Sequence, residues 1–286
     1  MEQTHSIQLL TPCFCRGIDN RDDAEPEIRP ASIRGHLRSW HRALFADPRA
    51  EKELFGGVGK GAVSSPVIVR VANVQGKASK FPTLPHKEGG RAAKKKAFAP
   101  GTTFDLLVST RRGGISETQQ TQLSMSIKAW LLGGGLGLRV TRGAGSIQCE
   151  KLTQDLNEFK KEINQTLHFS GSLISFPLVL PFPYSHPENA RIKASDTIGG
   201  RDDYTGNDSL RHMNYPLGTL GSRREGTSRK TSPLRFTIRA FEDKYRIVMH
   251  WNGTSGEKAN MKSIIKALVD KKKALGSEIF KAFQER

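Results

Sequence analysis

The sequence is short of cysteine and of long apolar runs, and each shortage excludes a class of protein. Its 286 residues include three cysteines, Cys13, Cys15 and Cys149. Such a small, odd set cannot form a disulfide framework, so we expect a reducing compartment, the cytoplasm. No segment approaches the roughly 20 apolar residues that a membrane-spanning helix needs. Residues 1–8 are mostly polar, so we expect neither a signal peptide nor a membrane partner.

The cysteines also lack the spacing of a metal site. One residue separates Cys13 from Cys15, which is too close for a zinc knuckle, and no paired Cys/His set follows them. On a strand, the two thiols would simply point to the same side. We therefore expect no metal ion and no other cofactor.

Acidic residues are the third shortage. Asp and Glu number 28 against 45 Lys and Arg, which leaves a formal net charge of +17. This excess is self-repulsive unless a polyanion neutralises it, and phosphate contacts dominate the affinity of proteins for nucleic acid. An anionic membrane surface or scattered solvated charges are the alternatives. Hydrophobic residues make up 36% of the chain, which excludes wholesale disorder.

The first half of the chain predicts the element order β-α-β-β-α-β, which is the ferredoxin-like pattern shared with RNA-recognition modules. Both expected helices carry apolar residues at helical spacing. Ser32 is the expected N-cap of the first helix, which should end before Pro48. Ser116 and Gln119 predict a capping box for the second, which should end at the glycines 133–135. The expected strands span residues 6–14, 63–74, 98–110 and 146–152.

The second half of the chain predicts a degenerate copy of the same fold. A strand is expected at residues 167–180, a hairpin at 234–251 and an amphipathic helix at 261–269. Residues 181–229 are rich in Pro, Gly, Asn and Arg and predict loop. The chain is therefore expected to be α+β, with domains at residues 1–155 and 156–286.

Three arginines on the first helix are the first candidate binding site. Arg34, Arg38 and Arg42 are four residues apart, so they lie along one face of the helix. Guanidinium groups suit phosphate, and the backbone N–H groups near Ser32 add donors at the positive end of the helix dipole. A solvated basic face is the alternative. Since no acid follows these arginines at helical spacing, we favour contact with the RNA backbone.

A glycine-rich segment at residues 133–145 is the second candidate site. Its glycines allow the backbone to approach a ligand closely, and Arg139 and Arg142 add charge. It is not a phosphate-binding Walker loop, because no Gly-Lys-Ser/Thr ends it. A long helix cap with a tight turn is the alternative. The residues expected to touch RNA here are Gly137, Arg139, Arg142 and Gly143.

A basic stretch at residues 75–96 is the third candidate. Its cations outnumber a single acid, Glu88, and end in the run Lys94, Lys95 and Lys96. We interpret the stretch as a mobile basic loop that adds to the RNA-binding surface.

Several of these motifs resemble the RAMP proteins of type III CRISPR systems, in particular the subunit 1 family of the type III-B (Cmr) effector complex. The resemblance is specific over about residues 7–147 and patchy beyond them. His41 departs from the family pattern, which usually has a second aromatic there. The motifs are residues 32–44 after Glu27-Ile28-Arg29, Glu53-Leu54-Phe55-Gly56, the glycine-rich segment, Thr11-Pro12 and Ser232-Pro233-Leu234-Arg235-Phe236.

The resemblance implies a fold and a role. The fold would be two fused ferredoxin-like (RRM-like) domains, the second degenerate. The role would be a noncatalytic subunit of an antiviral RNA-guided effector, which holds the guide RNA near its 3′ region, or the target paired to it, beside other RAMP subunits. Ser32, Arg34 and Arg38 would grip the RNA backbone, and Arg139 and Arg142 would flank the glycine-rich segment.

Some relatives are endoribonucleases, so catalysis is the alternative function. Guide-processing enzymes use a histidine as acid or base, for which His36 and His41 are the candidates. Subunits that cut target RNA use an aspartate in the loop after the first strand, where Asp19, Asp22 and Asp23 lie. A lone histidine on a helix more often packs or faces solvent, and these carboxylates sit beside basic residues that can simply pair with them.

Overall fold

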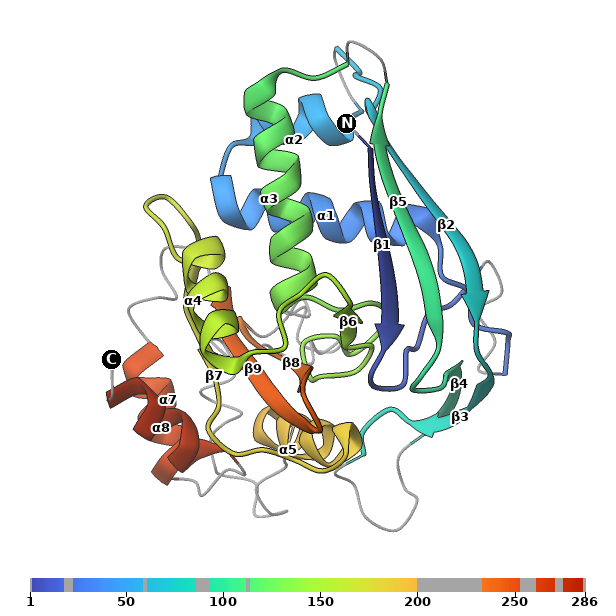
Figure 1. The fold of residues 1–286 in the computed structure, drawn as a ribbon. Helices are drawn as coiled ribbons and strands as arrows, with labels where there is room; N and C mark the ends of the chain where they lie inside the picture. The colour runs from blue at the N-terminus through green and yellow to red at the C-terminus, as the bar shows by residue number, and fades with distance from the viewer. Residues whose placement is uncertain are drawn as a thin grey trace, which may run out of the picture.

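The first half of the chain forms a four-stranded antiparallel sheet in the order β2-β5-β1-β6. By position in the chain this is the order 2-3-1-4 of a ferredoxin-like fold, which confirms the predicted β-α-β-β-α-β arrangement. Helices α1 and α3 pack against each other and against the sheet (Figure 1). The elements are β1 (Glu2–Leu9), α1 (Pro30–Phe45), α2 (Pro48–Phe55), β2 (Val67–Gln75), β5 (Thr103–Thr110), α3 (Glu117–Gly133) and β6 (Ile147–Cys149). The computed structural model describes residues 2–17, 23–58, 61–85, 93–111, 114–199, 233–252, 261–270 and 275–284.

The helix ends follow the sequence signals in one helix and depart from them in the other. α3 begins at the predicted capping box, in which Ser116 and Gln119 bond each other's backbone. α1 begins at Pro30, with Arg29 as an N-cap that makes no side-chain bond. The predicted Ser32 N-cap is therefore wrong. Proline fits the first helical turn, where its missing N–H costs nothing, so the helix starts before the serine.

The basic stretch at residues 75–96 is not a loop throughout, which corrects the prediction. β3 (Ala78–Pro82) and β4 (Lys94–Phe98) form a separate antiparallel hairpin. Ala97 and Phe81 on its inner face contact Phe14 and Ala144. Packing against residues distant in the sequence thus orders a segment that its charge alone predicted to be mobile. Residues 86–92 at its tip lie outside the described part of the chain.

The second half forms a three-stranded sheet in the order β7-β9-β8. This is the order 1-3-2 of a ferredoxin-like fold without its fourth strand in the described residues, which fits the predicted degenerate copy. The predicted loop at 181–229 is wrong at its start, because α5 occupies part of it. Residues 201–229 lie outside the description. The elements are α4 (Leu156–Leu167), β7 (Ile174–Val179), α5 (Pro187–Gly199), β8 (Leu234–Phe241), β9 (Lys244–Asn252), α7 (Met261–Asp270) and α8 (Gly276–Gln284).

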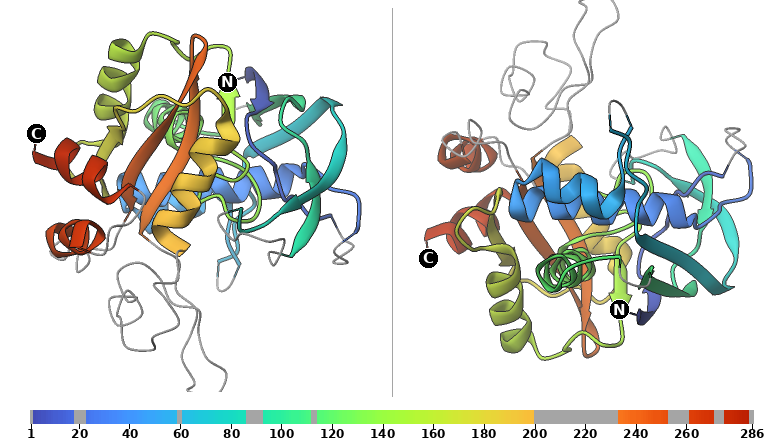
Figure 2. Two further views of the ribbon diagram at one scale, coloured as in Figure 1. Left: turned by 90° about the horizontal axis from the view of Figure 1, so that it is seen from below. Right: turned by 90° about the horizontal axis from the view of Figure 1, so that it is seen from above.

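The second sheet is covered on both faces. Phe236, Met249 and Trp251 point to one face, in a core shared with α5, α7 and α8. Val248 and His250 point to the other face, which meets the first core and the helix α1. Figure 2 shows α5 and α1 on opposite sides of β8 and β9. The sheet is therefore a middle layer between its own helices and those of the first half.

The division of the chain after residue 155 stays a prediction. Helix α4 begins at Leu156 and packs on both α3 and β7, so it contacts both halves. Among the described residues, no helix is long and apolar enough to cross a membrane.

Candidate nucleic-acid interface

The three arginines of α1 line an open groove between α1, α2 and the segment that follows α2. The groove has a volume of about 750 Å³. Arg34 is exposed and makes no ion pair with any described residue. The predicted apolar face of the helix is buried on the other side, with Leu37 and Leu44 inaccessible to solvent. The groove is lined by Arg34, Arg38, Arg42, Pro48, Glu51, Lys52, Phe55, Gly56, Gly57, Val58, Val63 and Ser65.

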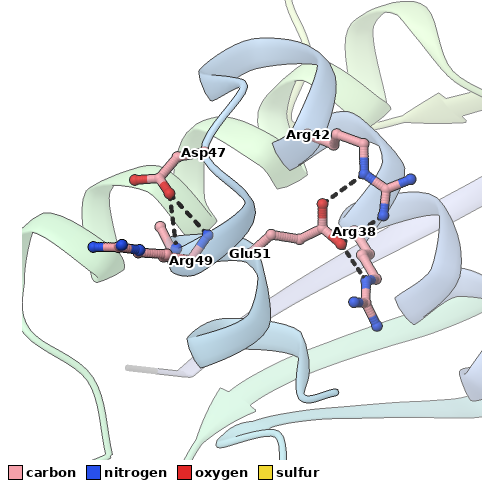
Figure 3. A network of polar contacts seen from close by, with 6 residues as sticks. Arg38, Arg42, Asp47, Arg49 and Glu51 are labelled. Atoms are coloured by element: carbon pink, nitrogen blue, oxygen red, sulfur yellow. Dashed lines mark hydrogen bonds and ion pairs between the residues drawn. The ribbon is translucent and has the colours of Figure 1, made fainter. Parts of the chain in front are cut away.

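A buried carboxylate holds two of these arginines. Arg38 Nε donates to Glu51 Oε1 at 2.5 Å, and Arg42 donates through Nε and Nη2, each at 2.6 Å (Figure 3). The Glu51 side chain is 4% exposed, whereas those of Arg38 and Arg42 are 37% and 63% exposed. The hydrogen bond from Arg42 lowers the pKa of the Glu51 carboxyl, with smaller contributions from Arg38. The acid therefore lies beneath the two guanidinium groups and leaves their outer N–H groups toward the groove.

Helix α2 brings Glu51 to this position. Asp47 caps α2 by accepting hydrogen bonds from the backbone N–H groups of Arg49 and Ala50, at 2.9 and 3.1 Å. Pro48 occupies the first turn. Sequence reasoning missed Glu51 because it searched for acids at helical spacing within α1. The Asp-Pro signal for a new helix, with an acid inside it, was available in the sequence.

The glycine-rich segment is a tightly packed junction between the two sheets. Gly143 N–H donates to Phe236 O at 3.1 Å, and Phe236 N–H donates to Thr141 O at 3.1 Å. Thr11 Oγ1 donates to Gly143 O at 2.7 Å. A Cβ on Gly145, where φ is +58°, would lie 1.8 Å from Leu136 O. The helix-cap alternative thus accounts for the glycines, including Gly137, where a Cβ would lie 2.9 Å from Phe14 O.

A buried arginine completes this junction from the second sheet. Arg239 is inaccessible to solvent. Its Nη2 donates to Leu131 O at 2.6 Å and to Gly134 O at 3.1 Å, at the carboxyl end of α3. This is the negative end of the helix dipole, where a cation is stabilising. Burial lowers the pKa of Arg239 to about 9. No sequence signal distinguished this arginine from the exposed ones.

The structure brings only part of the two predicted sites together. Leu138 N–H donates to Phe14 O at 3.1 Å, and Glu27 N–H donates to Cys15 O at 3.2 Å. Residues 14–15 thus lie between the glycine-rich segment and Glu27, which comes shortly before α1. Ser32, in the first turn of α1, is half-buried. Arg38 and Arg42 lie instead at the α2 end of the helix. Arg139, at φ +65°, and Arg142 are half-buried in the junction, with Arg142 bridged to Phe236.

The three predicted lysines lie on β4 and differ in their surroundings. Lys94 is exposed, and Lys96 pairs with Glu25 on the outer face of the hairpin. Lys95 is half-buried on the inner face, opposite Phe81. The hairpin is tied to the second half by Arg191 of α5, a residue that sequence reasoning missed. Its Nη2 donates to Pro82 O at 2.8 Å, and its guanidinium lies 5.6 Å from the Phe14 ring centroid.

The candidate catalytic residues that the structure describes do not assemble into an acid–base site. His41 is inaccessible to solvent, with its ring 4.9 Å from that of Phe45 and 5.7 Å from that of Phe55. It therefore packs as an aromatic residue would. Asp23 is exposed, and Asp19 and Asp22 lie outside the described residues. Among the described residues, no three His, Cys, Asp or Glu side chains gather as a metal site would require.

The remaining histidine candidate and the three cysteines lie away from solvent to different degrees. His36 is half-buried on α1, and burial, followed by the charge of Arg235, lowers its pKa to about 4. Its imidazole is therefore uncharged at neutral pH and is not poised to act as a general acid. Cys13, Cys15 and Cys149 are buried free thiols.

Comparison with known proteins gives a consistent set of relatives. The family model described as the RAMP superfamily matches residues 6–148. The CRISPR system Cmr subunit Cmr1-2 of Pyrococcus furiosus is 27% identical over 194 residues, which cover 54% of this chain and 98% of that protein. The crystal structure of apo Cmr1 from Pyrococcus furiosus has a TM-score of 0.56 at 19% identity, with 92% of this chain and 96% of that chain covered.

A subunit of a larger assembly has the same fold. A chain in the cryo-electron microscopy structure of the type III-B Cmr-beta complex bound to cognate target RNA has a TM-score of 0.57 at 11% identity. The match covers 94% of this chain and 98% of that one. At these identities the two structural matches establish the fold, which spans both sheets.

Proposed function

The chain belongs to the RAMP superfamily, and from this membership we propose that it is a noncatalytic, RNA-binding subunit of a type III-B CRISPR effector complex. Its partners would be other RAMP subunits, together with guide RNA near its 3′ region or the target paired to it. The likeness to a protein named as a Cmr subunit supports this role. The groove lined by Arg34, Arg38 and Arg42 is the observation that carries the proposal.

The groove has the chemistry that an RNA backbone requires. Arg34 is exposed, and Arg38 uses only Nε for Glu51, so its terminal nitrogens make no hydrogen bond with another described residue. Guanidinium groups donate in pairs to phosphate oxygens. Such contacts fix register without reading bases. We therefore expect binding with little sequence preference, as a subunit that accepts many different guides requires.

The test is RNA binding by the full chain. A labelled guide–target duplex and its single strands are titrated with wild-type protein and with the Arg34→Ala/Arg38→Ala double variant. We expect the double variant to lose about tenfold to a hundredfold in affinity, because each lost charge-assisted bond is worth about 1.5 kcal/mol. Wild-type affinity should also fall steeply with salt. Unchanged affinity in the double variant would reject the groove as the binding site.

The same preparation tests the catalytic alternative. With Mg²⁺ present, we expect the labelled RNA to remain intact. Cleavage that disappears in an Asp19→Asn/Asp22→Asn/Asp23→Asn triple variant would make the chain an endoribonuclease and overturn its noncatalytic role.

A further inference from the structure

Arg235, His36 and His250 lie together between α1 and the second sheet and are named the seam cluster. Arg235 and His250 are register partners on β8 and β9, so their Cβ atoms lie about 5 Å apart on one face. α1 covers this face, since the Trp40 ring lies 5.2 Å from the His250 ring. His36 lies one turn before Trp40 on the same side of α1. Burial, with the charges of Arg235 and Arg239, lowers the pKa of His250 to about 3.

The seam cluster has donors without acceptors. Nε of Arg235 and both ring nitrogens of His250 are buried and have no hydrogen-bond partner among the described residues. His250 is 1% exposed. Burial lowers the pKa of Arg235, and no carboxylate contributes to that shift. Arg235 is half-buried and has no counter-ion among the described residues, an arrangement that favours an anion.

The two fully buried arginines, Arg191 and Arg239, donate through their terminal nitrogens to protein acceptors, although Nε of Arg239 also lacks a partner. Arg239 donates to three carbonyl oxygens and a hydroxyl. Arg191 donates to Glu188 Oε1 at 2.5 Å and to Pro82 O. Arg235 has neither kind of partner among the described residues. Its guanidinium is therefore the one of the three that is left for a ligand.

Two members of the seam cluster reach solvent. Arg235 and His36 both keep part of their surface exposed, whereas His250 is buried. Phe236, the residue after Arg235, is hydrogen-bonded to Thr141 of the glycine-rich segment. Arg235 thus directly precedes a residue that is bonded to the segment where RNA contact was predicted. His36 points away from the arginine groove, because residues two apart on a helix differ by about 200°.

We propose that Arg235 and His36, backed by His250, bind a phosphate group of the RNA chain at the seam between α1 and the second sheet. The inference rests on the proposed function, since it assumes that the chain binds RNA. Arg235 supplies paired N–H donors and the positive charge, and His36 supplies a further N–H. The site is separate from the arginine groove, so the RNA contacts α1 on two sides.

The experiment compares Arg235→Gln with Lys244→Gln in full-length protein. Both changes remove one positive charge from the β8–β9 hairpin, but Lys244 lies at its tip and pairs with Asp243. With labelled single-stranded RNA, Arg235→Gln should weaken binding about tenfold and reduce the salt slope by about 0.7, the value for one phosphate. Lys244→Gln should change affinity less than about twofold. Wild-type affinity and slope in Arg235→Gln would overturn the site.

A second measurement separates binding from folding. Arg235→Gln removes a half-buried cation that has no counter-ion among the described residues, so its melting temperature should equal or exceed that of the wild type; a marked drop would mean that Arg235 is structural and would overturn the inference. Nuclear magnetic resonance of His36 should show its pKa rising from about 4 when RNA binds. A His36 response to inorganic phosphate with no effect of Arg235→Gln on RNA would mark an adventitious ion only. Loss of RNA binding in the Arg34→Ala/Arg38→Ala variant, with Arg235→Gln unaffected, would retain the proposed function and reject the seam site.

Discussion

At the scale of single residues, Glu51 changes how the arginine face is understood. The charge pattern of α1 alone suggests three free cations, but Glu51 binds two of them. A carboxylate that bridges two guanidinium groups restricts their rotamers, and a preorganised donor loses less entropy when it binds phosphate. Glu51 therefore lowers the net charge of the groove while fixing the direction of its donors.

This balance gives a prediction with a definite sign. Glu51→Gln adds one unit of positive charge, so bulk electrostatics predicts tighter RNA binding, whereas loss of preorganisation predicts weaker binding. We expect RNA affinity to fall by about threefold to tenfold and stability by about 1–3 kcal/mol. RNA titration and denaturant unfolding measure the two effects. Glu53→Gln is the matched control, since Glu53 is exposed on the same helix.

The control should change stability by less than about 0.5 kcal/mol. Tighter RNA binding by Glu51→Gln would mean that the acid is only a competitor for the arginines.

At the scale of elements, the glycine-rich segment illustrates how one pattern supports two explanations. Its glycines were predicted to allow a ligand to approach the backbone closely. The structure shows that other parts of the same chain pack against them. A Cβ on Gly145 would overlap Leu136 O, and a Cβ on Gly143 would lie 3.1 Å from Ile238 Cδ1. The RNA contacts of Gly137, Gly143, Arg139 and Arg142 stay predictions.

Two glycine substitutions test this structural role. Gly145→Ala should destabilise the fold by about 3 kcal/mol or more, because the added methyl group would overlap Leu136 O at a left-handed backbone position. Gly35→Ala is the matched change, since a Cβ there meets no atom within 4 Å. It lies inside α1 and should stabilise by about 0.5–1 kcal/mol. Equal unfolding midpoints for the two variants would contradict the packing described for the segment.

At the scale of the whole molecule, the two sheets meet through α1 and the carboxyl end of α3. Apolar contacts such as Phe159 with Phe241, at 5.0 Å between ring centroids, lie beside the buried cations of the second sheet. The junction therefore combines buried apolar side chains with histidines that are uncharged in the fold and with Arg239, which is hydrogen-bonded to carbonyl oxygens. It should be the first part of the fold to respond to acid.

The pH dependence of stability follows from the two seam histidines. The pKa of His250 is about 3 and that of His36 about 4 in the folded chain, against about 6.5 when unfolded. The unfolded chain thus binds more protons below about pH 6.5, so stability falls as the pH drops toward the folded values. Denaturant midpoints between pH 7 and pH 5 should decrease in the wild type. His250→Gln should flatten this slope, and an unchanged slope would show that His250 is accessible and protonated.

The sequence by itself determined the first ferredoxin-like unit. Apolar spacing, the Ser116 capping box and the glycine stop depend on neighbours along the chain, so they could be recognised without tertiary structure. The outcome differed where partners are distant. Helix α1 begins at Pro30 and not at the predicted cap Ser32, which is a local effect. Packing on Phe14 orders the basic hairpin, and α5 forms in a segment predicted as loop.

The candidate site divides in the same way. The sequence determined that Arg34, Arg38 and Arg42 share a helix face, because the α-helical repeat fixes their direction. Only the tertiary structure decided that Glu51 lies beneath two of them, that His41 is a core residue and that Arg235 faces His36. Charge pairing and burial depend on segments brought together across the fold, and no spacing along the chain encodes those distances.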